Sequence, residues 1–347
     1  MNEHVLITGG AGFIGRHLAL NLHRQGHPVT VLDRLDNPNA RFSVGELTAL
    51  GIEVVAGDVA DLHLVRALID GHRTVVHLAA PTVGVEQMLG AAQAHAGALT
   101  YAAQLAAMLS PEHTLLFSST SDVYGLHSVH YGDKAMAEDD LTVYEAPTVS
   151  RWNYSKVKAL AEEVFASCPA RSVSVRIFNT YGPGFDYPQA RRVIPQFAAA
   201  VSAGTALRVS GHGGQHRAFC YIGDTVDGIA RALAFGRTLP EGGNAVFNIG
   251  NDDPDAYVSM LQLAETMADL AVALGFVTER PVVDKGGYHY SRAFDDTWNR
   301  RPDITRARAL LGFAPRTTLA DGLAEVLAFH ARQAGRTQEH CASRQEA

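Results

Sequence analysis

The start of the chain changes from a strand pattern to a helix pattern across a turn rich in glycine. An apolar run at 5–8 is typical of a buried strand, and apolar residues recur at helical spacing over 13–22. Between them stand Gly9, Gly12 and Gly15. In a strand–turn–helix, such glycines make the tight turn, admit a pyrophosphate and let the helix pack closely on its strand. The helix N-terminus adds N–H donors, so this stretch predicts a dinucleotide site.

Apolar runs and helical patterns alternate through the first half of the chain. We expect further strands at 28–32, 52–56, 74–78, 114–117 and 172–178, and helices at 62–69, 88–109 and 153–166. This alternation predicts an α/β fold, a Rossmann-type doubly wound parallel sheet. In such sheets ligands bind outside the carboxyl ends of the strands.

The second half is richer in glycine and proline, and its pattern is less regular. We expect helices at 190–203, 224–234, 258–274, 306–311 and 319–332, with short strands near 206–209 and 246–249. Residues 1–178 are therefore predicted to form the cofactor domain, to which parts of 214–249 return. Residues 179–333 mainly form a smaller, mixed α/β substrate domain, and 334–347 form a polar, frayed tail.

Composition excludes several classes of protein. Of 347 residues, 47% are hydrophobic and 19% charged, which is typical of a globular protein, and the net charge of −7 provides no basic surface for nucleic acid. Three scattered cysteines fit neither a disulfide framework nor a zinc site. The stretch 88–109 is apolar through alanine and contains Gln93, His95 and Gln104, so we expect no membrane span. With no signal peptide before the first strand, a cytoplasmic protein is expected.

Polar residues follow the expected strands where a cofactor would lie. Asp33 ends the second strand, close to the ~20-residue distance at which an acidic residue holds the adenosine ribose. Arg34 is an opposing signal, because an arginine there can pair with the 2′-phosphate of NADP. Asp33 ends the strand and is fixed by the turn, so we predict NAD. Asp58 and Thr120 follow the third and fifth strands.

The helix at 153–166 carries a Tyr-x-x-x-Lys pair. Tyr154 and Lys158 are four residues apart, so their side chains share one helix face. Such a pair is common by chance. Its combination with Thr120 at the end of a neighbouring strand favours a catalytic interpretation.

Several motifs in this order resemble the extended short-chain dehydrogenases/reductases that modify nucleotide sugars. The resemblance runs from about 5 to 332 and rests on 9–15, Thr120 within S-S-T-S-D-V-Y-G, Tyr154 with Lys158, and R-I-F-N-T-Y-G-P at 176–183. Further matches lie at 216–222, 248–250 and 300–304. The group includes 4-epimerases, 4,6-dehydratases and UDP-glucuronate decarboxylases. Residues 150–154 also resemble a branch with unassigned epimerases and the decarboxylase linked to polymyxin resistance.

The resemblance implies a bound NAD that takes hydride from a sugar carbon, usually C4. Tyr154 would take the hydroxyl proton, and Thr120 would orient the sugar oxygen. A tyrosine near pKa ~10 is a poor base, so Lys158 and the positive nicotinamide are expected to stabilise its phenolate. Lys158 would also meet the nicotinamide ribose, and Asp58 the adenine. The remaining cofactor contacts are expected at Phe13, Ile14, Val59, Leu78, Ala79 and Ala80.

The resemblance also implies substrate contacts and a dimer. Asn179 and Arg217 match positions that meet the diphosphate, for which the planar fork of arginine is suited. Arg192 and Arg300 match arginines that face the substrate in decarboxylases. Helices 88–109 and 153–166 match those of an intersubunit four-helix bundle, so we expect a homodimer with small residues such as Ala91, Ala92, Ala102 and Ala103 at the contact.

Departures from the family pattern leave the exact substrate open. Ala94 and Ala218 replace an asparagine and an aspartate, and His212 replaces an acidic residue. Asp122 stands where decarboxylases and dehydratases have glutamate and simple epimerases a small residue. Among 16 histidines, the pairs His127/His130 and His212/His216 lack a third ligand, so we expect no metal site. The roles of these histidines and of His289 stay open.

The three candidate reactions share oxidation at C4. A 4-epimerase needs Thr120, Tyr154 and Lys158 alone. Dehydratases use adjacent Asp and Glu where this chain has Ser121 and Asp122, and decarboxylases need cations such as Arg192 and Arg300. Because Asp122 is one methylene short and a ~1 Å error can cost ~100-fold, we rank 4-epimerisation first. Decarboxylation of a UDP-uronic acid is second and dehydration third. A non-catalytic NAD(H) sensor is a further alternative that the Tyr–Lys pair disfavours.

Overall fold

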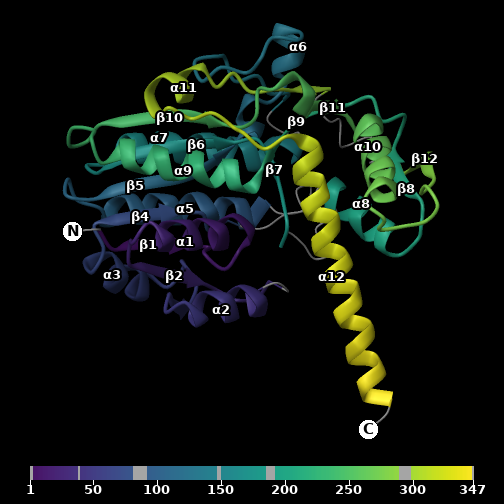
Figure 1. Cartoon of the computed structure of the whole chain (residues 1–347). Coiled ribbons are helices and arrows are strands. Elements are labelled where there is room, and N and C mark those ends of the chain that lie inside the picture. The colour runs from purple at the N-terminus through teal and green to yellow at the C-terminus, as the bar shows by residue number, and fades with distance from the viewer. Residues whose placement is uncertain are drawn as a thin grey trace.

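The computed structural model describes residues 3–37, 40–80, 92–146, 150–184, 192–288 and 298–345. Its main feature is a seven-stranded parallel sheet in the order β10-β6-β5-β4-β1-β2-β3 (Figure 1). The strands are β1 (Val5–Thr8), β2 (Val29–Asp33), β3 (Glu53–Ala56), β4 (Thr74–His77), β5 (Thr114–Thr120), β6 (Arg171–Ile177) and β10 (Asn244–Ile249). The order reverses between β1 and β4, where ligands bind in such sheets. The predicted Rossmann-type α/β fold is confirmed.

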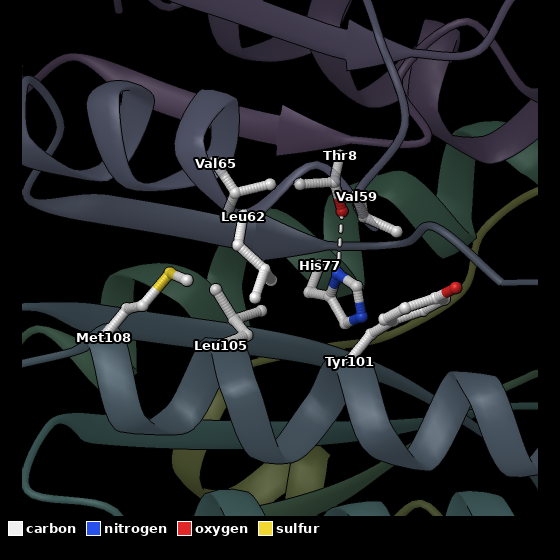
Figure 2. Close-up of a pocket in the computed structure, with 8 residues that line it drawn as sticks. All are labelled: Thr8, Val59, Leu62, Val65, His77, Tyr101, Leu105 and Met108. Atoms are coloured by element: carbon white, nitrogen blue, oxygen red, sulfur yellow. Dashed lines mark hydrogen bonds between the residues drawn. The ribbon is translucent and has the colours of Figure 1, made fainter.

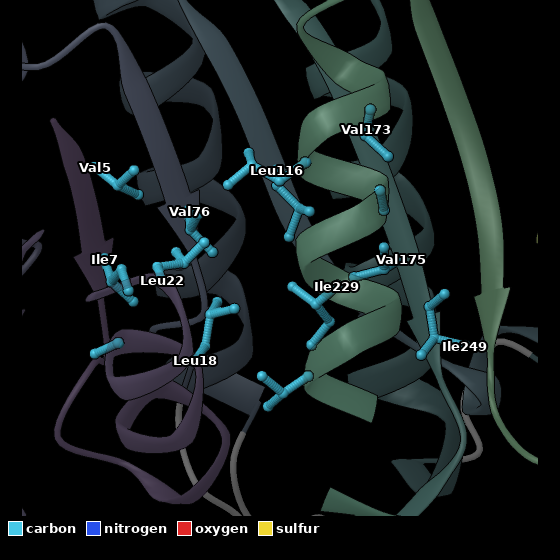
Figure 3. Packing of buried hydrophobic residues seen from close by; sticks show 14 of the residues in the cluster. Val5, Ile7, Leu18, Leu22, Val76, Leu116, Val173, Val175, Ile229 and Ile249 are labelled. Carbon is cyan, nitrogen blue, oxygen red and sulfur yellow. The ribbon is translucent and has the colours of Figure 1, made fainter. Parts of the chain in front are cut away.

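Helices cover both faces of this sheet. On one face, Val5 and Ile7 of β1 pack with Leu18 of α1 (Phe13–Arg24) and Ile229 of α9 (Ile222–Gly236) (Figure 3). Leu6, between Val5 and Ile7 in β1, points to the opposite face of the sheet. That face is covered by α3 (Leu62–Asp70), α5 (Ala92–Met108) and α7 (Asn153–Ala166). Each fully buried aliphatic side chain contributes roughly 1.5–3 kcal/mol. This packing fixes the edge formed by the carboxyl ends of the strands.

A smaller region follows the sheet along the chain. It contains β7 (Asn179–Tyr181), β9 (His216–Tyr221), β11 (Tyr257–Ser259) and β13 (Asn299–Arg300), and a separate pair, β8 (Leu207–Ser210) with β12 (Val283–Tyr288). Helices α8 (Val193–Ser202), α10 (Met260–Ala273) and α12 (Leu319–Gln345) pack around a second core. Figure 1 shows α12 running on past this core towards the C-terminus. The smaller mixed region is confirmed, whereas the domain boundaries stay a prediction.

Several predicted boundaries were wrong. The helix expected from 258 begins at Met260, because 257–259 forms β11 and Ser259 closes a capping box with Gln262. The structure has a helix in two places where none was predicted, α2 (Ala40–Ala49) and α6 (His127–Tyr131). The tail expected to fray continues α12 as far as Gln345, in a sequence rich in good helix formers. None of the helices in the described ranges could span a membrane.

Candidate active site

The glycine-rich turn lies between β1 and α1. Gly9 has a φ of +71°, and a Cβ there would lie 2.8 Å from the backbone nitrogen of Ala79. A Cβ on Gly15 would lie 2.4 Å from the carbonyl oxygen of Gly9. A Cβ on Gly12 would lie 3.2 Å from that same oxygen. No other described atom would lie within 4 Å of it, so there is room for a side chain at this position. The backbone therefore requires two of the glycines, whereas Gly12 leaves open the N-terminus of α1, which fits a cofactor pyrophosphate.

Asp33 ties this turn to the end of β2. Its Oδ2 accepts the N–H of Ala11 at 3.0 Å, and its Oδ1 accepts the N–H of Leu35 at 2.9 Å. The neighbouring Arg34 is exposed and lies 2.8 Å from Asp36 and 3.6 Å from Asp58. The arginine that could have favoured a 2′-phosphate therefore faces two carboxylates.

The other predicted cofactor residues lie at the same edge of the sheet. Phe13 and Ile14 begin α1, and Asp58, with Val59 beside it, follows β3. Leu78, Ala79 and Ala80 follow β4 and are half-buried. Beneath this edge is a small apolar cavity (Figure 2), lined by Thr8, Val59, Leu62, Val65, His77, Tyr101, Leu105 and Met108. Val59 is a predicted cofactor residue that lines this cavity, and none of the predicted catalytic residues lines it.

Thr120 is on β5, and Tyr154 and Lys158 are on α7, which bonds to that strand two residues before Thr120. Thr120 ends β5, and its Oγ1 accepts the N–H of Asp122 at 3.2 Å. Lys158 donates from Nζ to the carbonyl oxygen of Ser118 at 2.6 Å. Burial lowers the pKa of Lys158 to about 8, against the opposing charge of Glu162.

The pKa of Tyr154 is set by its surroundings. Burial first, and the charge of Asp122 second, raise its pKa to about 12, and the charge of Arg192 acts in the opposite direction. At neutral pH Tyr154 is therefore a neutral phenol. The expected stabilisation of its phenolate by Lys158 and the nicotinamide stays a prediction.

Asp122 is the centre of a buried cluster of charges. It lies in a 3-10 turn directly after β5, and its Oδ1 is 2.6 Å from Arg300 Nη2 and 3.5 Å from Arg151 Nη2. Burial alone would raise the pKa of Asp122, but the charges of Arg300, Arg151 and Arg217 outweigh it and hold this pKa below its ordinary value. The carboxylate is thus an anion at neutral pH with guanidinium groups around it.

The predicted substrate residues lie in the smaller region. Arg300 on β13 pairs in register with Arg217 on β9, and both side chains are buried. Asn179 begins β7, which pairs with the same strand. Arg192 is exposed just before α8. Arg217 and Arg300 are therefore brought together with Asp122, while Arg192 reaches the site through the effect of its charge on Tyr154.

Two of the histidines whose roles were left open contact neighbouring side chains. His127 pairs with Asp140 at 2.9 Å, and His212 stacks on Trp298 with ring centroids 5.4 Å apart. His289 lies outside the described residues. Within those residues no group of three His, Cys, Asp or Glu side chains could hold a metal ion.

Sequence reasoning missed two parts of the site. Arg151, the second cation on Asp122, precedes α7 in a 3-10 turn and carries no spacing signal. Glu162 lies behind Lys158 and is bound by Arg176 and Ser119. Its spacing of four residues from Lys158, on the same helix face, could have indicated it.

Comparison with known proteins agrees with this geometry. Residues 5–250 match the NAD dependent epimerase/dehydratase family. The chain is 31% identical to a UDP-N-acetyl-alpha-D-glucosaminuronate decarboxylase of Bacillus cytotoxicus, over 94% of this chain and 97% of that protein. It is 30% identical to a dTDP-glucose 4,6-dehydratase of Streptomyces niveus, over 94% and 92%. The structure of MoeE5 in complex with UDP-glucuronic acid and NAD superposes with a TM-score of 0.73 and 25% identity, covering 95% of this chain and 99% of that one.

The comparisons and the fold agree on the class of protein. The motifs from Gly9 to Lys158 lie within the matched residues and at one edge of the sheet. The relatives named above are enzymes or complexes of nucleotide sugars. This chain is an NAD-dependent enzyme that belongs to the NAD-dependent epimerase/dehydratase family.

Proposed function

We propose that this enzyme oxidises C4 of a nucleotide-diphospho-uronic acid and then releases the C5 carboxylate as CO₂. The supporting observation is the buried cluster of Asp122 with Arg300 and Arg151, directly after Thr120. Guanidinium groups bind carboxylates through parallel N–H donors. Asp122 orients two of them beside the expected sugar position, where an anionic C6 group would lie. The Bacillus cytotoxicus relative is named for this reaction on a related uronate.

The order of steps follows from the residues at the edge of the sheet. Bound NAD, which the turn at Gly9–Gly15 and Asp33 would hold, would supply the acceptor for the C4 hydride and its donor in the last step. Tyr154 receives the O4 proton while Thr120 holds the same oxygen. Because Tyr154 has a pKa of about 12, this step needs added positive charge near its ring, which Lys158 and the nicotinamide of bound NAD would supply together.

The second step uses the ketone that the first step makes. The C5–C6 bond breaks, CO₂ leaves, and the electron pair moves into an enolate whose negative oxygen is the former O4. Tyr154, now protonated, and Thr120 donate hydrogen bonds to that oxygen. C5 keeps its own hydrogen and takes one new proton from solvent water in place of the lost CO₂, which restores the C4 ketone. The ketone is then reduced at C4 while Tyr154 gives its proton back to O4. Asn179 and Arg217 are proposed to hold the diphosphate, with Arg192 at the rim of the site.

Product analysis tests this proposal. Purified enzyme with its NAD is incubated separately with UDP-glucuronate, UDP-N-acetylglucosaminuronate and UDP-glucose, and the products are analysed by mass spectrometry. The proposal predicts a product lighter by the mass of CO₂ from at least one uronate and no such product in the Tyr154→Phe variant. Conversion of UDP-glucose alone would contradict it.

A 4-epimerase acting on the same kind of sugar is the second candidate. The observation that favours it is that the Asp122 carboxylate is occupied by arginines, and an epimerase needs no further acid or base. Sequence reasoning ranked this reaction first, and the buried arginines and the decarboxylase relative support the reverse order. Asp122→Ala separates the two, because an epimerase keeps much of its activity and a decarboxylase stalls. Unchanged product mass with inverted C4 would favour epimerisation.

We also propose a homodimer built on α5 and α7, which pack against each other in this chain. Ala102, expected at the subunit contact, is instead buried in the chain's own core, whereas Ala103 is exposed. The side chains of Ala91 and Ala92 lie outside the described residues. Light scattering at micromolar concentration tests the dimer, and a monomer mass would refute it.

A further inference from the structure

Glu162 lies one helical turn beyond Lys158 on α7 and takes no part in the reaction described above. Tyr154, Lys158 and Glu162 follow one another at intervals of four residues, so they share one face of the helix. That face is turned towards β5, and Glu162 and Lys158 are both buried. A buried carboxylate in this position needs partners that hold it.

The partners of Glu162 come from two neighbouring strands. Arg176 of β6 donates from Nη2 to Oε2 at 2.8 Å and from Nε to Oε1 at 3.1 Å, a two-pronged ion pair. Ser119 of β5 donates its hydroxyl to Oε1. The carboxylate is therefore fixed, because each of its oxygens has a donor in place.

Two consecutive residues of β5 hold two consecutive turns of α7. The carbonyl oxygen of Ser118 accepts from Lys158, and the hydroxyl of Ser119 binds Glu162. The next residue, Thr120, is one of the proposed catalytic groups. The contacts of Lys158 and Glu162 thus set the register between the helix that carries Tyr154 and the strand that carries Thr120.

We propose that Glu162 is a positioning residue for Lys158: with Arg176 and Ser119 it fixes this turn of α7 and keeps an anion one helical turn from Lys158. The inference rests on the proposed role of Lys158 in C4 oxidation. Its physical purpose is to keep a buried lysine protonated. A neutral Lys158 could no longer stabilise negative charge on Tyr154.

The surroundings of Lys158 make this anion important. His77 on β4 has its pKa lowered to about 3 by burial and by Lys158 itself, so it is neutral and supplies no negative charge. Arg176 on β6 is a cation, His95 on α5 lies against the Tyr154 ring, and Asp122 is taken up by arginines. Of the described groups, Glu162 is the one whose charge opposes the effect of burial on Lys158.

The test measures the protonation of Lys158 directly. The chain contains four lysines, Lys134, Lys156, Lys158 and Lys285, so lysine labelled at its ε-carbon gives a simple NMR spectrum. The Lys158 signal is assigned by its loss in Lys158→Met. In the wild-type enzyme with NAD we expect this signal to titrate well before those of the other three lysines. In Glu162→Gln the midpoint should fall by about one pH unit.

Two further variants make the result specific. Glu138→Gln neutralises another buried carboxylate near Arg176 and should leave the Lys158 midpoint unchanged. If Glu162→Gln does not fold, Glu162→Gln/Arg176→Met removes both charges of the pair, which proteins tolerate better than one. The midpoint should fall in that variant too, but by less, because removing the Arg176 cation acts in the opposite direction. A wild-type midpoint in whichever Glu162 variant folds, or an equal shift in Glu138→Gln, would overturn the proposal.

A kinetic measurement links the midpoint to turnover. With UDP-glucuronate as substrate, kcat of Glu162→Gln should begin to change on the alkaline side of its pH profile about one pH unit lower than in the wild type, as the NMR midpoint does. KM should stay near its wild-type value. A rise in KM with no movement of the kcat profile would contradict the positioning role. The NMR midpoint needs no substrate, so the inference can fail or succeed independently of the proposed reaction.

Discussion

The proposed cofactor side and the proposed substrate side of the site are held together by different kinds of interaction. On the cofactor side, Gly9 and Gly15 are fixed by backbone contacts, and Asp33 accepts two backbone N–H groups. On the substrate side, Asp122 and Arg300 form a buried ion pair between residues 178 positions apart in the chain. The first side therefore depends on shape and the second on charge, and substitutions should affect the two sides in different ways.

Tyr154→Phe should have the largest effect on turnover, because Tyr154 lies where the two sides meet. The change removes one hydroxyl and should lower kcat by about a thousandfold, within the range for a lost general acid–base group. Both sides keep their contacts, so NAD and nucleotide sugar should still bind. Steady-state kinetics with a NAD titration measures both. Near-normal kcat would rule out the proposed proton transfer.

Gly15→Ala should damage the cofactor side through shape alone. Its Cβ would lie 2.4 Å from the carbonyl oxygen of Gly9 and 2.6 Å from the Cα of Gly10, and both are backbone atoms that cannot move aside as a flexible side chain could. We expect about 3 kcal/mol of lost stability and much weaker NAD binding. Gly12→Ala is the matched control, since its Cβ meets the same oxygen at 3.2 Å and should cost the fold little. Thermal unfolding and NAD titration of both variants compare them, and equal losses of stability would contradict this account.

Asp122→Asn should damage the substrate side through charge alone. Removing one partner of a buried ion pair costs about 3 kcal/mol at neutral pH. The arginines hold the pKa of Asp122 below its ordinary value, so its contribution to the free energy of unfolding is complete above about pH 4 and lost as pH falls through the lower folded pKa. Denaturant unfolding should therefore show the difference between wild type and variant shrinking in acid. A difference independent of pH would argue against the ion pair.

Arg34→Ala should have the smallest effect. Arg34 is exposed, and its charge already faces Asp36 and Asp58. Exposed ion pairs contribute little, so the preference for NAD over NADP should change by less than about twofold. Competitive titration of the two cofactors measures this, and a strong preference for NADP in the wild type would show that Arg34 dominates Asp33.

The same contrast explains what the sequence could predict. The turn at Gly9–Gly15 and the Tyr154–Lys158 pair are local patterns, and each lies within one strand–turn–helix or one helix. Sequence spacing therefore located them, and the NAD-dependent family was confirmed.

The substrate side was harder to predict because it is assembled from distant segments. Arg151 reaches Asp122 through the packing of the turn before α7, which no spacing encodes. Burial and the charge of Asp122 both raise the pKa of Tyr154, and neither effect could be predicted from the lysine four residues away. Local motifs indicate which groups are present, whereas tertiary packing sets their charge.

Binding to an inactive holoenzyme tests the central claim most directly. In Tyr154→Phe, which should not turn over, calorimetry compares UDP-glucuronate with UDP-glucose, two ligands that differ at C6. The account predicts that UDP-glucuronate binds at least about tenfold tighter, and that adding Arg300→Gln removes most of this preference. Equal affinities for the two ligands in Tyr154→Phe would contradict a substrate side built to bind an anionic sugar.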